Sequence, residues 1–399
     1  MSSSPYRSLG KNTSIFAIGT FGSKVISFFM LPIFTRVLTQ ADYGKIDIIT
    51  TSISLLLPLL ILNIVEAVFR FTLDKGSLEE KQAIFTSALT VGTVGFLFLL
   101  FFIPICIPFG LSGQLLAAFP ALFLVDIIHG ITKVLIRAEQ RLRLYAVSDI
   151  INIAVFVVMG ILLVAFFRMG VIGYLISQMI GVTVSTAALF LFGSVGKYIL
   201  PSALTVVQIK VMIKYSLPLV PNALAWWIIT ASDRYMLAFF LGFSSTGIYS
   251  VAHKFPMLPV LRCILSGMEN ILDRSFNSPE RKQFYSNIFR VLCVLMFLGT
   301  IAFAIILRLF IIIMTGEGFQ EAWRFVPFLI LGTVFHSFSQ FLWCRLSYRK
   351  EDWWGLQNIW YWCSSKYYCE SSLDSVNRNS SSLDFYCNRI FLNVDCQAD

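Results

Sequence analysis

The chain has 399 residues, of which 57% are hydrophobic and 13% charged, with a mean hydropathy of +0.77 and a formal net charge of +9. A soluble domain keeps about a quarter of its residues charged, so this composition excludes a soluble globular protein and indicates a membrane protein. The basic residues lie in short loops between apolar runs and form no stripe or patch, which argues against a nucleic-acid partner.

The first apolar stretch follows a polar start, 1–12, that carries Arg7 and Lys11. The stretch is too long to be the apolar region of a cleavable signal peptide. We therefore expect the first helix to stay in the lipid bilayer as a signal-anchor.

Ten segments are long and apolar enough to cross the hydrocarbon core as helices, which takes about 20 residues each. Their apolar runs are continuous rather than alternating, which excludes β-strands as the spans. The predicted fold class is therefore an all-α polytopic membrane protein. In chain order, the expected spans are 13–37, 45–68, 83–108, 115–136, 145–167, 171–193, 216–241, 247–273, 285–314 and 323–345.

Lys and Arg gather in alternate loops, a bias that places the N-terminus in the cytoplasm. The loops on the opposite side are short: 110–114, 168–170 and 242–246. A membrane polymerase or glycosyltransferase needs a sizeable catalytic segment outside the bilayer. The short loops therefore predict that the protein is not an enzyme.

The longest internal connection, 193–215, divides the expected helices into two groups. A weak repeat supports this division. In the first group, Leu31-Pro32 is followed by Thr35–Leu38 and Ala41–Gly44. In the second group, Leu217-Pro218 is followed by Asp233–Leu237 and Thr246–Tyr249, which resemble them. Paired signals of this kind are typical of transporters built from two related bundles. We expect a six-helix bundle over 1–205 and a second bundle, with helices 7–10, over 206–350.

The eight cysteines include no CxxC pair and give no metal signature. Cys106, Cys263, Cys293 and Cys344 lie in or beside apolar segments, where we expect small buried hydrophobic side chains. We predict neither a metal nor a cofactor.

Ionisable or strongly polar groups at membrane depth are costly unless they face a cavity or a partner, so each is a candidate for function. Asn222 follows Pro221, where a disturbed helix presents free carbonyl groups to a cavity. Lysine and arginine in a cavity suit an anionic headgroup such as a diphosphate, which guanidinium binds in bidentate fashion. The candidates for lining a substrate cavity are Lys24, Arg36, Glu66, Arg70, Asn222, Asp233, Arg234 and Lys254.

Asp126 and His129, three residues apart on one helix face, are candidates for ion coupling because imidazole titrates near neutrality. The alternative is a satisfied hydrogen-bonded pair. Glu66 and Arg70 share a face and are also open to interpretation as a structural pair. Arg36 and Arg70 lie near helix ends, where extension to the lipid headgroups is the alternative to function.

The motifs of the first helix resemble those of a known family. The stretch from Ser14 to Lys24, the stretch from Phe29 to Thr39, and Asp42-Tyr43-Gly44 resemble the opening of Wzx-type polysaccharide flippases. These flippases belong to the multidrug/oligosaccharidyl-lipid/polysaccharide exporter (MOP) superfamily, which includes the MATE transporters.

Later motifs extend the resemblance over roughly residues 8–350. The stretch Tyr215 to Asn222, followed by Ser232-Asp-Arg-Tyr235, is similar to the family's seventh helix, and Phe284 to Arg290 is similar to its ninth. Lys24, Arg36, Asn222, Asp233 and Arg234 match positions within these motifs.

The resemblance implies transport of undecaprenyl-diphosphate-linked oligosaccharide repeat units across the bacterial inner membrane for O-antigen or capsular polysaccharide synthesis. It implies two bundles that alternate access around a cationic cavity. The polysaccharide polymerase and chain-length machinery are the partners it suggests. The rival from the same superfamily is a multidrug or cation exporter, which would favour acidic residues in the cavity.

The tail 351–399 does not fit this family, which has at least twelve spans. Trp, Cys, Ser, Asn and Tyr replace the aliphatic runs there. From Trp360 onward, permitted codons read one base later spell two apolar runs that resemble the family's last two helices. We interpret the tail as the product of a frameshift, so a non-functional truncated product is a further alternative. The charged patch 262–276 is a candidate for a second, compensated shift.

Overall fold

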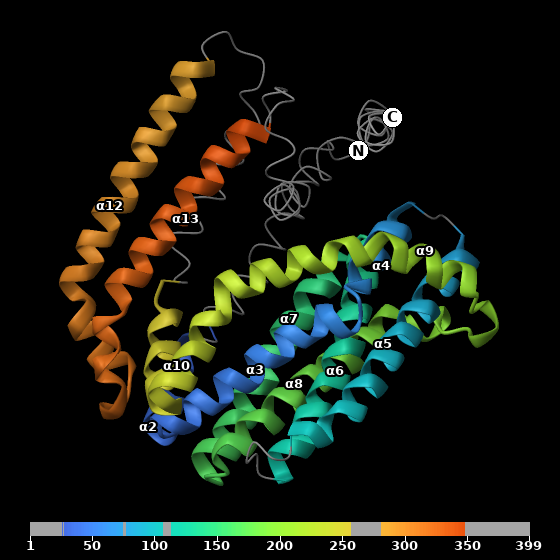
Figure 1. Ribbon diagram of the computed structural model, residues 1–399, viewed down its shortest axis with the longest axis horizontal. Helices are drawn as coiled ribbons and strands as arrows, with labels where there is room; N and C mark the ends of the chain where they lie inside the picture. Colours follow the sequence, from blue (N-terminus) through green and yellow to red (C-terminus); the bar gives the residue numbers. More distant parts are fainter. Residues whose placement is uncertain (1–25, 27, 75–76, 107–112, 257–280, 348–399) are drawn as a thin grey trace, which may run out of the picture. The chain divides into compact units, whose positions relative to one another are not determined.

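The computed structural model describes residues 26, 28–74, 77–106, 113–256 and 281–347 (Figure 1). Within these residues the regular structure is entirely helical. The α-helices are α2 (Leu31–Val37), α3 (Gln40–Leu60), α4 (Ile64–Asp74), α5 (Leu78–Cys106), α6 (Gly113–Ala138), α7 (Leu142–Gly160), α8 (Gly170–Gly193), α9 (Val206–Ser216), α10 (Val220–Lys254), α12 (Arg281–Met314) and α13 (Val326–Ser347). The short elements are the π-helix η2 (Ile161–Phe166) and the 3-10 helices η3 (Val195–Tyr198), η4 (Pro201–Ala203), η5 (Leu217–Leu219) and η6 (Glu317–Arg324).

Seven helical stretches in the described part of the chain are long and apolar enough to cross a membrane. They are Gln40–Leu60, Leu78–Phe101, Gly113–Ala138, Leu142–Phe166, Gly170–Gly193, Val206–Lys254 and Phe289–Met314. A shorter apolar stretch, Val326–Phe335, lies in α13. The chain is an all-α polytopic membrane protein, as its sequence predicts.

Parts of the prediction fall outside the described residues. These are most of the expected span 13–37 with Lys24, the second part of 247–273, the patch 262–276 and the tail 351–399. The other expected spans each have a helix at their position.

The expected span 45–68 is two helices in the structure. Leu62 and Asn63, between α3 and α4, adopt the left-handed conformation, with φ of 52° and 51°. Pro58, which has no backbone N–H, lies in the last turn of α3. The Asn63 N–H donates to the Pro58 carbonyl at 2.9 Å, which closes the helix end with the hydrogen bond of a Schellman turn. This local closure ends α3 inside an apolar run that contains no glycine.

The expected loop 242–246 is shortened to a bend within α10. Gly242 has φ 82° and ψ 173°, so α10 consists of two helices that meet at a kink there. These angles are accessible to glycine because it lacks a Cβ atom. The two helices face each other, because the Tyr249 hydroxyl after the kink reaches Asp233 before it. The spans expected at 216–241 and 247–273 therefore meet at a single residue.

Two hydrophobic cores hold the described helices together. In the first, α3 to α9 pack around fully buried side chains such as Ile64, Phe85, Phe123 and Leu189. Met212 of α9 is buried in the same core. This core contains the helices that carry most of the expected first bundle.

The second core joins the earliest helices to the latest. Leu31 and Phe34 of α2 belong to the same buried cluster as Ile311 of α12, Phe319 of η6 and Val326 of α13. The first turns of α3 and the end of α10 complete this cluster. As a result α2 packs with helices that are synthesised much later.

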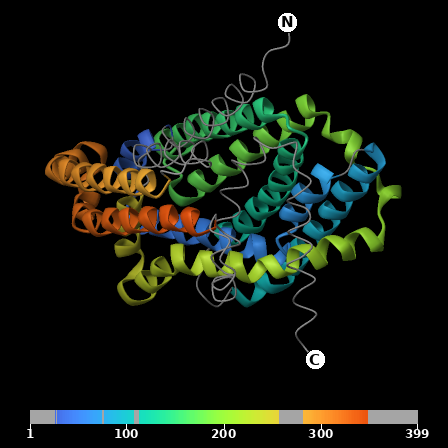
Figure 2. The ribbon, with the colours of Figure 1, turned by 90° about the horizontal axis from the view of Figure 1, so that it is seen from above.

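Helices α12 and α13 lie side by side in both ribbon views (Figures 1 and 2). The Phe338 ring of α13 lies 5.6 and 5.8 Å, centroid to centroid, from the Phe289 and Phe297 rings of α12. Ile301 and Ile305 of α12 are exposed. In a membrane protein exposed apolar side chains of this kind face lipid tails.

Candidate functional site

The backbones of α3 and α10 approach most closely at Gly44 and Gly247. A Cβ atom on Gly44 would overlap the Phe243 carbonyl oxygen, and a Cβ atom on Gly247 would overlap the Gln40 carbonyl oxygen. Each would also lie 3.0 Å from the backbone nitrogen of the other glycine. Small residues permit such close contact between membrane helices. The two glycines occur in the matching stretches of the sequence repeat. Each glycine makes the same kind of contact with the facing helix, as expected for two related helices that pack about a two-fold axis.

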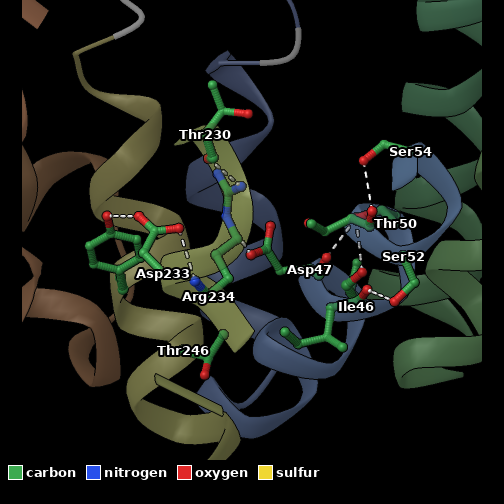
Figure 3. Close-up of polar contacts among 12 residues, drawn as sticks. Ile46, Asp47, Thr50, Ser52, Ser54, Thr230, Asp233, Arg234 and Thr246 are labelled. Atoms are coloured by element: carbon green, nitrogen blue, oxygen red, sulfur yellow. Dashed lines mark hydrogen bonds and ion pairs between the residues drawn. The ribbon is translucent and has the colours of Figure 1, made fainter. Parts of the chain in front are cut away.

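Asp47 of α3 and Arg234 of α10 point toward each other near this contact (Figure 3). The distance from Arg234 Nε to Asp47 Oδ2 is 3.0 Å, and the two side chains are 13% and 17% exposed. Neither atom has a hydrogen-bond partner among the described residues, so the contact is an ion pair rather than a directed hydrogen bond. The pair neutralises two charges within spans, where an uncompensated charge costs several kcal/mol.

Other contacts fix Arg234 on its own helix. Its Nη1 donates to the Thr230 carbonyl at 3.2 Å, and its backbone N–H donates to Asp233 Oδ1 at 2.9 Å. The Tyr249 hydroxyl donates to Asp233 Oδ2. Asp233 is thus bound within α10, and the carboxylate that pairs with the Arg234 guanidinium comes from α3.

Aromatic side chains of α10 extend the contact along α3. The Trp227 Nε1–H donates to the Thr51 carbonyl at 3.2 Å. The Tyr235 hydroxyl lies 2.5 Å from the Ser52 hydroxyl, and the Trp227 and Tyr235 ring centroids are 5.3 Å apart. The interface therefore combines a glycine contact, an ion pair and these aromatic contacts.

Lys254, in the last turn of α10, also faces α3. Its Nζ lies 5.1 Å from the centre of the Tyr43 ring, within the range of a cation–π interaction. Tyr43 is 3% exposed and precedes Asp47 by one helical turn. A second cation of α10 is thus held next to the helix that supplies the Asp47 carboxylate.

Arg36, at the end of α2, is exposed and donates from Nη2 to the Ile313 carbonyl of α12 at 3.3 Å. Its neighbours make related contacts. The Gly316 N–H donates to Thr35 Oγ1 at 3.0 Å, and Gln40 Nε2 donates to the Gly318 carbonyl. Arg36 therefore joins a set of contacts between the α2–α3 connection and the α12–η6 connection, apart from the Asp47–Arg234 pair.

The two predicted residues of α4 are not joined to each other by an ion pair in the structure. Arg70 Nε lies 3.3 Å from Asp74 Oδ2, and both side chains are about half exposed. Glu66 is partly buried in the first turn of α4. The side chain of Arg70 therefore points to an exposed partner and not to the helix interface.

Asp126 and His129 lie on α6, both partly buried. His129 Nδ1 is within 3.0 Å of Thr186 Oγ1 on α8, so a residue of another helix is the hydrogen-bond partner of the imidazole. One turn further, Lys133 forms an ion pair with Asp149 of α7, with side chains 22% and 15% exposed. These contacts form a polar column among α6, α7 and α8.

Asn222 is partly buried in the first turn of α10, distant along the helix from Arg234. Of the predicted residues, Asp233, Arg234 and Lys254 come together at the α3–α10 interface. An open groove of about 490 Å³ lies elsewhere, between the start of α5 and the 200–203 connection, and none of the predicted residues lines it.

The sequence prediction missed Asp47. A signal for it exists, because Asp47 is a carboxylate inside an expected span, the criterion that selected Glu66 and Asp126. Tyr235 and Tyr249 belong to the stretches of the sequence repeat, but a sequence does not reveal that their hydroxyls reach Ser52 and Asp233.

The fold is that of MATE transporters. An inward-facing multidrug resistance MATE family transporter of the MOP superfamily superposes with a TM-score of 0.58 at 11% sequence identity, over 83% of this chain and 84% of that one. An outward-facing one gives 0.55 at 14% identity, over 86% and 82%. A MATE in complex with MaL6 gives 0.56 at 13% identity, over 86% and 83%. These similarities define the class of fold, a polytopic helical membrane fold shared with MATE transporters.

The family model described as "Polysaccharide biosynthesis protein" matches residues 9–270, more than half of the chain. The protein belongs to this family of the MOP superfamily. A comparison of the sequence with curated proteins finds no significant match.

Proposed function

We propose that the protein flips undecaprenyl-diphosphate-linked oligosaccharide repeat units across the bacterial inner membrane, for O-antigen or capsular polysaccharide synthesis. The observation that carries the proposal is the pair of cations, Arg234 before the Gly242 kink of α10 and Lys254 after it, both held partly buried against α3. A cation at this depth suits an anionic headgroup, and guanidinium suits a diphosphate in particular. The polysaccharide biosynthesis family supports a carbohydrate-linked substrate.

The transport cycle we propose is alternating access between two bundles, 1–205 and 206–350. The Gly44–Gly247 contact and the Asp47–Arg234 pair then close one end of the pathway. With the N-terminus in the cytoplasm, Asp47 lies near the outer end of its span, so the closed end is the periplasmic one. The other end would admit the lipid-linked substrate from the cytoplasmic leaflet.

Individual residues take different parts in this proposal. Arg234 contacts the diphosphate, Lys254 contributes positive charge at the same interface, and Asp233 fixes Arg234 through its backbone. Lys24, Glu66 and Asn222 are proposed to line the cavity elsewhere. Arg36 and Arg70, both exposed, act near the lipid headgroups. Asp126 and His129 are the residues proposed for ion coupling.

The frameshift interpretation of the tail 351–399 leads to a separate expectation. If helices 11 and 12 are missing, the second bundle is incomplete and the product does not transport. Resequencing the gene and measuring the mass of the C-terminal peptide distinguish the two cases. One intact reading frame together with the tail in the mature protein contradicts the frameshift.

A multidrug or cation exporter is the second candidate. The observation in its favour is the presence of two carboxylates, Asp47 and Asp233, at the same interface as Arg234. An organic cation would pair with these carboxylates rather than with the arginine.

Deletion of the gene in its host tests the two candidates. If resequencing finds one intact reading frame, a flippase predicts that lipid-linked repeat units accumulate on the cytoplasmic side, that surface polysaccharide is lost, and that a plasmid copy restores it. Arg234→Gln on that plasmid should fail to restore it. Sensitivity to organic cations with normal surface polysaccharide would contradict the flippase and support the exporter.

A further inference from the structure

The ion pair between Asp47 and Arg234 raises a problem for any opening of the α3–α10 contact. Arg234 is bound to its own helix through Thr230 and Asp233, so it moves with α10. Asp47 moves with α3. Separating the helices therefore breaks the pair and leaves two charges, each less than one-fifth exposed, without their counter-ions. Because such charges are costly, the empty protein is held closed.

We propose that the Asp47 carboxylate occupies the position on Arg234 that the substrate's diphosphate takes during transport. The anionic diphosphate headgroup displaces the Asp47 carboxylate, and this exchange releases α3 from α10. The inference rests on the proposed function and deepens it, since it states what the substrate does to the closed state. A ligand shifts a conformational equilibrium only through its different affinity for the two states. Here the difference arises because the closed state already occupies Arg234.

The geometry of the pair favours exchange. The Arg234–Asp47 contact is made at Nε, with no directed hydrogen bond to the carboxylate oxygen. Nη1 is turned toward the Thr230 carbonyl. The planar guanidinium has five N–H groups and binds phosphate oxygens through two parallel hydrogen bonds. A diphosphate would therefore form two hydrogen bonds with the Arg234 guanidinium, whereas the Asp47 contact at Nε forms none.

Exchange also requires a new counter-ion for Asp47. Lys254 lies over the ring of Tyr43, one turn before Asp47 on α3. The Lys254 ammonium group is at the end of a flexible side chain, so it can move from the Tyr43 ring to the Asp47 carboxylate one turn away. Lys254 is therefore the cation that we assign to Asp47 once the diphosphate occupies Arg234.

Equilibrium binding of radiolabelled farnesyl diphosphate to the purified full chain tests the exchange, with farnesol as the uncharged competitor. Asp47→Asn removes the competing carboxylate and should tighten binding about tenfold, a typical coupling between linked equilibria. Asp47→Glu keeps the carboxylate and should bind like the unchanged protein. Arg234→Gln should weaken binding. In a chain that already carries Arg234→Gln, Asp47→Asn should not change the affinity further.

Asp149→Asn is the matched control. It removes a carboxylate of similar exposure from an ion pair within α6 and α7 and should leave the affinity unchanged. Binding of inorganic pyrophosphate distinguishes a free diphosphate from a lipid-linked diphosphate as the ligand. The same dependence on Asp47 with pyrophosphate supports exchange by free diphosphate as well, and dependence with farnesyl diphosphate alone supports exchange by the lipid.

Hydrogen exchange on the unchanged chain provides a second measurement that needs no variant. Farnesyl diphosphate, but not farnesol, should speed amide exchange in 40–47 and 243–250. The inference is overturned if Asp47→Asn binds no more tightly than the unchanged chain, if Asp149→Asn tightens binding equally, or if these amides do not respond. Failure of the unchanged chain to bind any diphosphate would instead refute the proposed function, and the inference with it.

Discussion

Gly44 of α3 and Gly247 of α10 contact each other reciprocally: a Cβ atom on either glycine would lie 3.0 Å from the backbone nitrogen of the other and would overlap a carbonyl oxygen of the facing helix. Two residues more than two hundred positions apart thus pack so closely that a single added methyl group on either would overlap the backbone of the facing helix. The same contact brings Asp47 and Arg234 to ion-pair distance. The charge pair therefore depends on two residues that have no side chains.

Gly247→Ala should destabilise the protein by about 1–3 kcal/mol, because the added methyl group overlaps the Gln40 carbonyl and the helices must move apart. In a thermal unfolding measurement in detergent, the purified variant should have a lower apparent melting temperature than the unchanged protein. Gly130→Ala in α6 is the control, since a Cβ there meets no atom within 4 Å and alanine favours a helix. Equal melting temperatures for the two variants would contradict the close contact.

Gly242→Ala should also destabilise the protein, by about 1–3 kcal/mol, but through the backbone rather than through a clash. The Cβ would meet nothing within 4 Å, yet φ 82° with ψ 173° is a conformation that side chains strongly disfavour. Gly299→Ala in α12, also with open space, should show no loss. The thermal unfolding of both variants distinguishes strain from steric overlap.

Lys133→Met should lower stability by about 1–3 kcal/mol, less than for a fully buried pair, because it leaves the Asp149 carboxylate mostly buried without its cation. Arg70→Met breaks a pair of the same charge type whose side chains are 53% and 51% exposed. Such exposed pairs contribute about 0–1 kcal/mol. Similar losses from both variants would show that burial does not set the strength of these pairs.

Thr186→Val should cost about 0.5–1.5 kcal/mol by removing the hydroxyl bonded to His129. Thr183→Val on the same helix is the control, since among the described residues its hydroxyl donates to the Met179 carbonyl of its own helix and not to another helix. If His129 carries protons during transport, Thr186→Val also shifts the pH profile of transport. A loss of stability with an unchanged pH profile would assign the imidazole a structural role.

The spans could be predicted because hydrophobic length is a local property of the sequence. The run from Gly170 to Gly193, for example, is apolar enough to read directly as α8. The break after α3 could not be predicted, since it depends on Leu62, an apolar residue in a conformation usually taken by glycine or asparagine. Hydrophobicity gives no signal for such a residue.

The site was predicted in part for a similar reason. Depth in an apolar run identifies Arg234 and Lys254 as unusual, but the partner of a charge depends on helix packing. Residues that share a helix face were therefore paired by default, as with Glu66 and Arg70. The structure instead pairs Arg234 with a carboxylate of another helix, Asp47.

The contacts of α2 and of the first residue of α3 have a consequence for biosynthesis. Thr35 bonds to Gly316 across 281 positions, and Gln40 bonds to Gly318 across 278. At about 5–20 residues per second, the ribosome needs on the order of tens of seconds to make the later partner after the earlier one. During that time the newly inserted α2 has no native neighbours from α12 or η6. A chain released before residue 316 would keep the contacts of Phe34 with Phe156 and Tyr174 but would lack the later partners that complete the packing of α2.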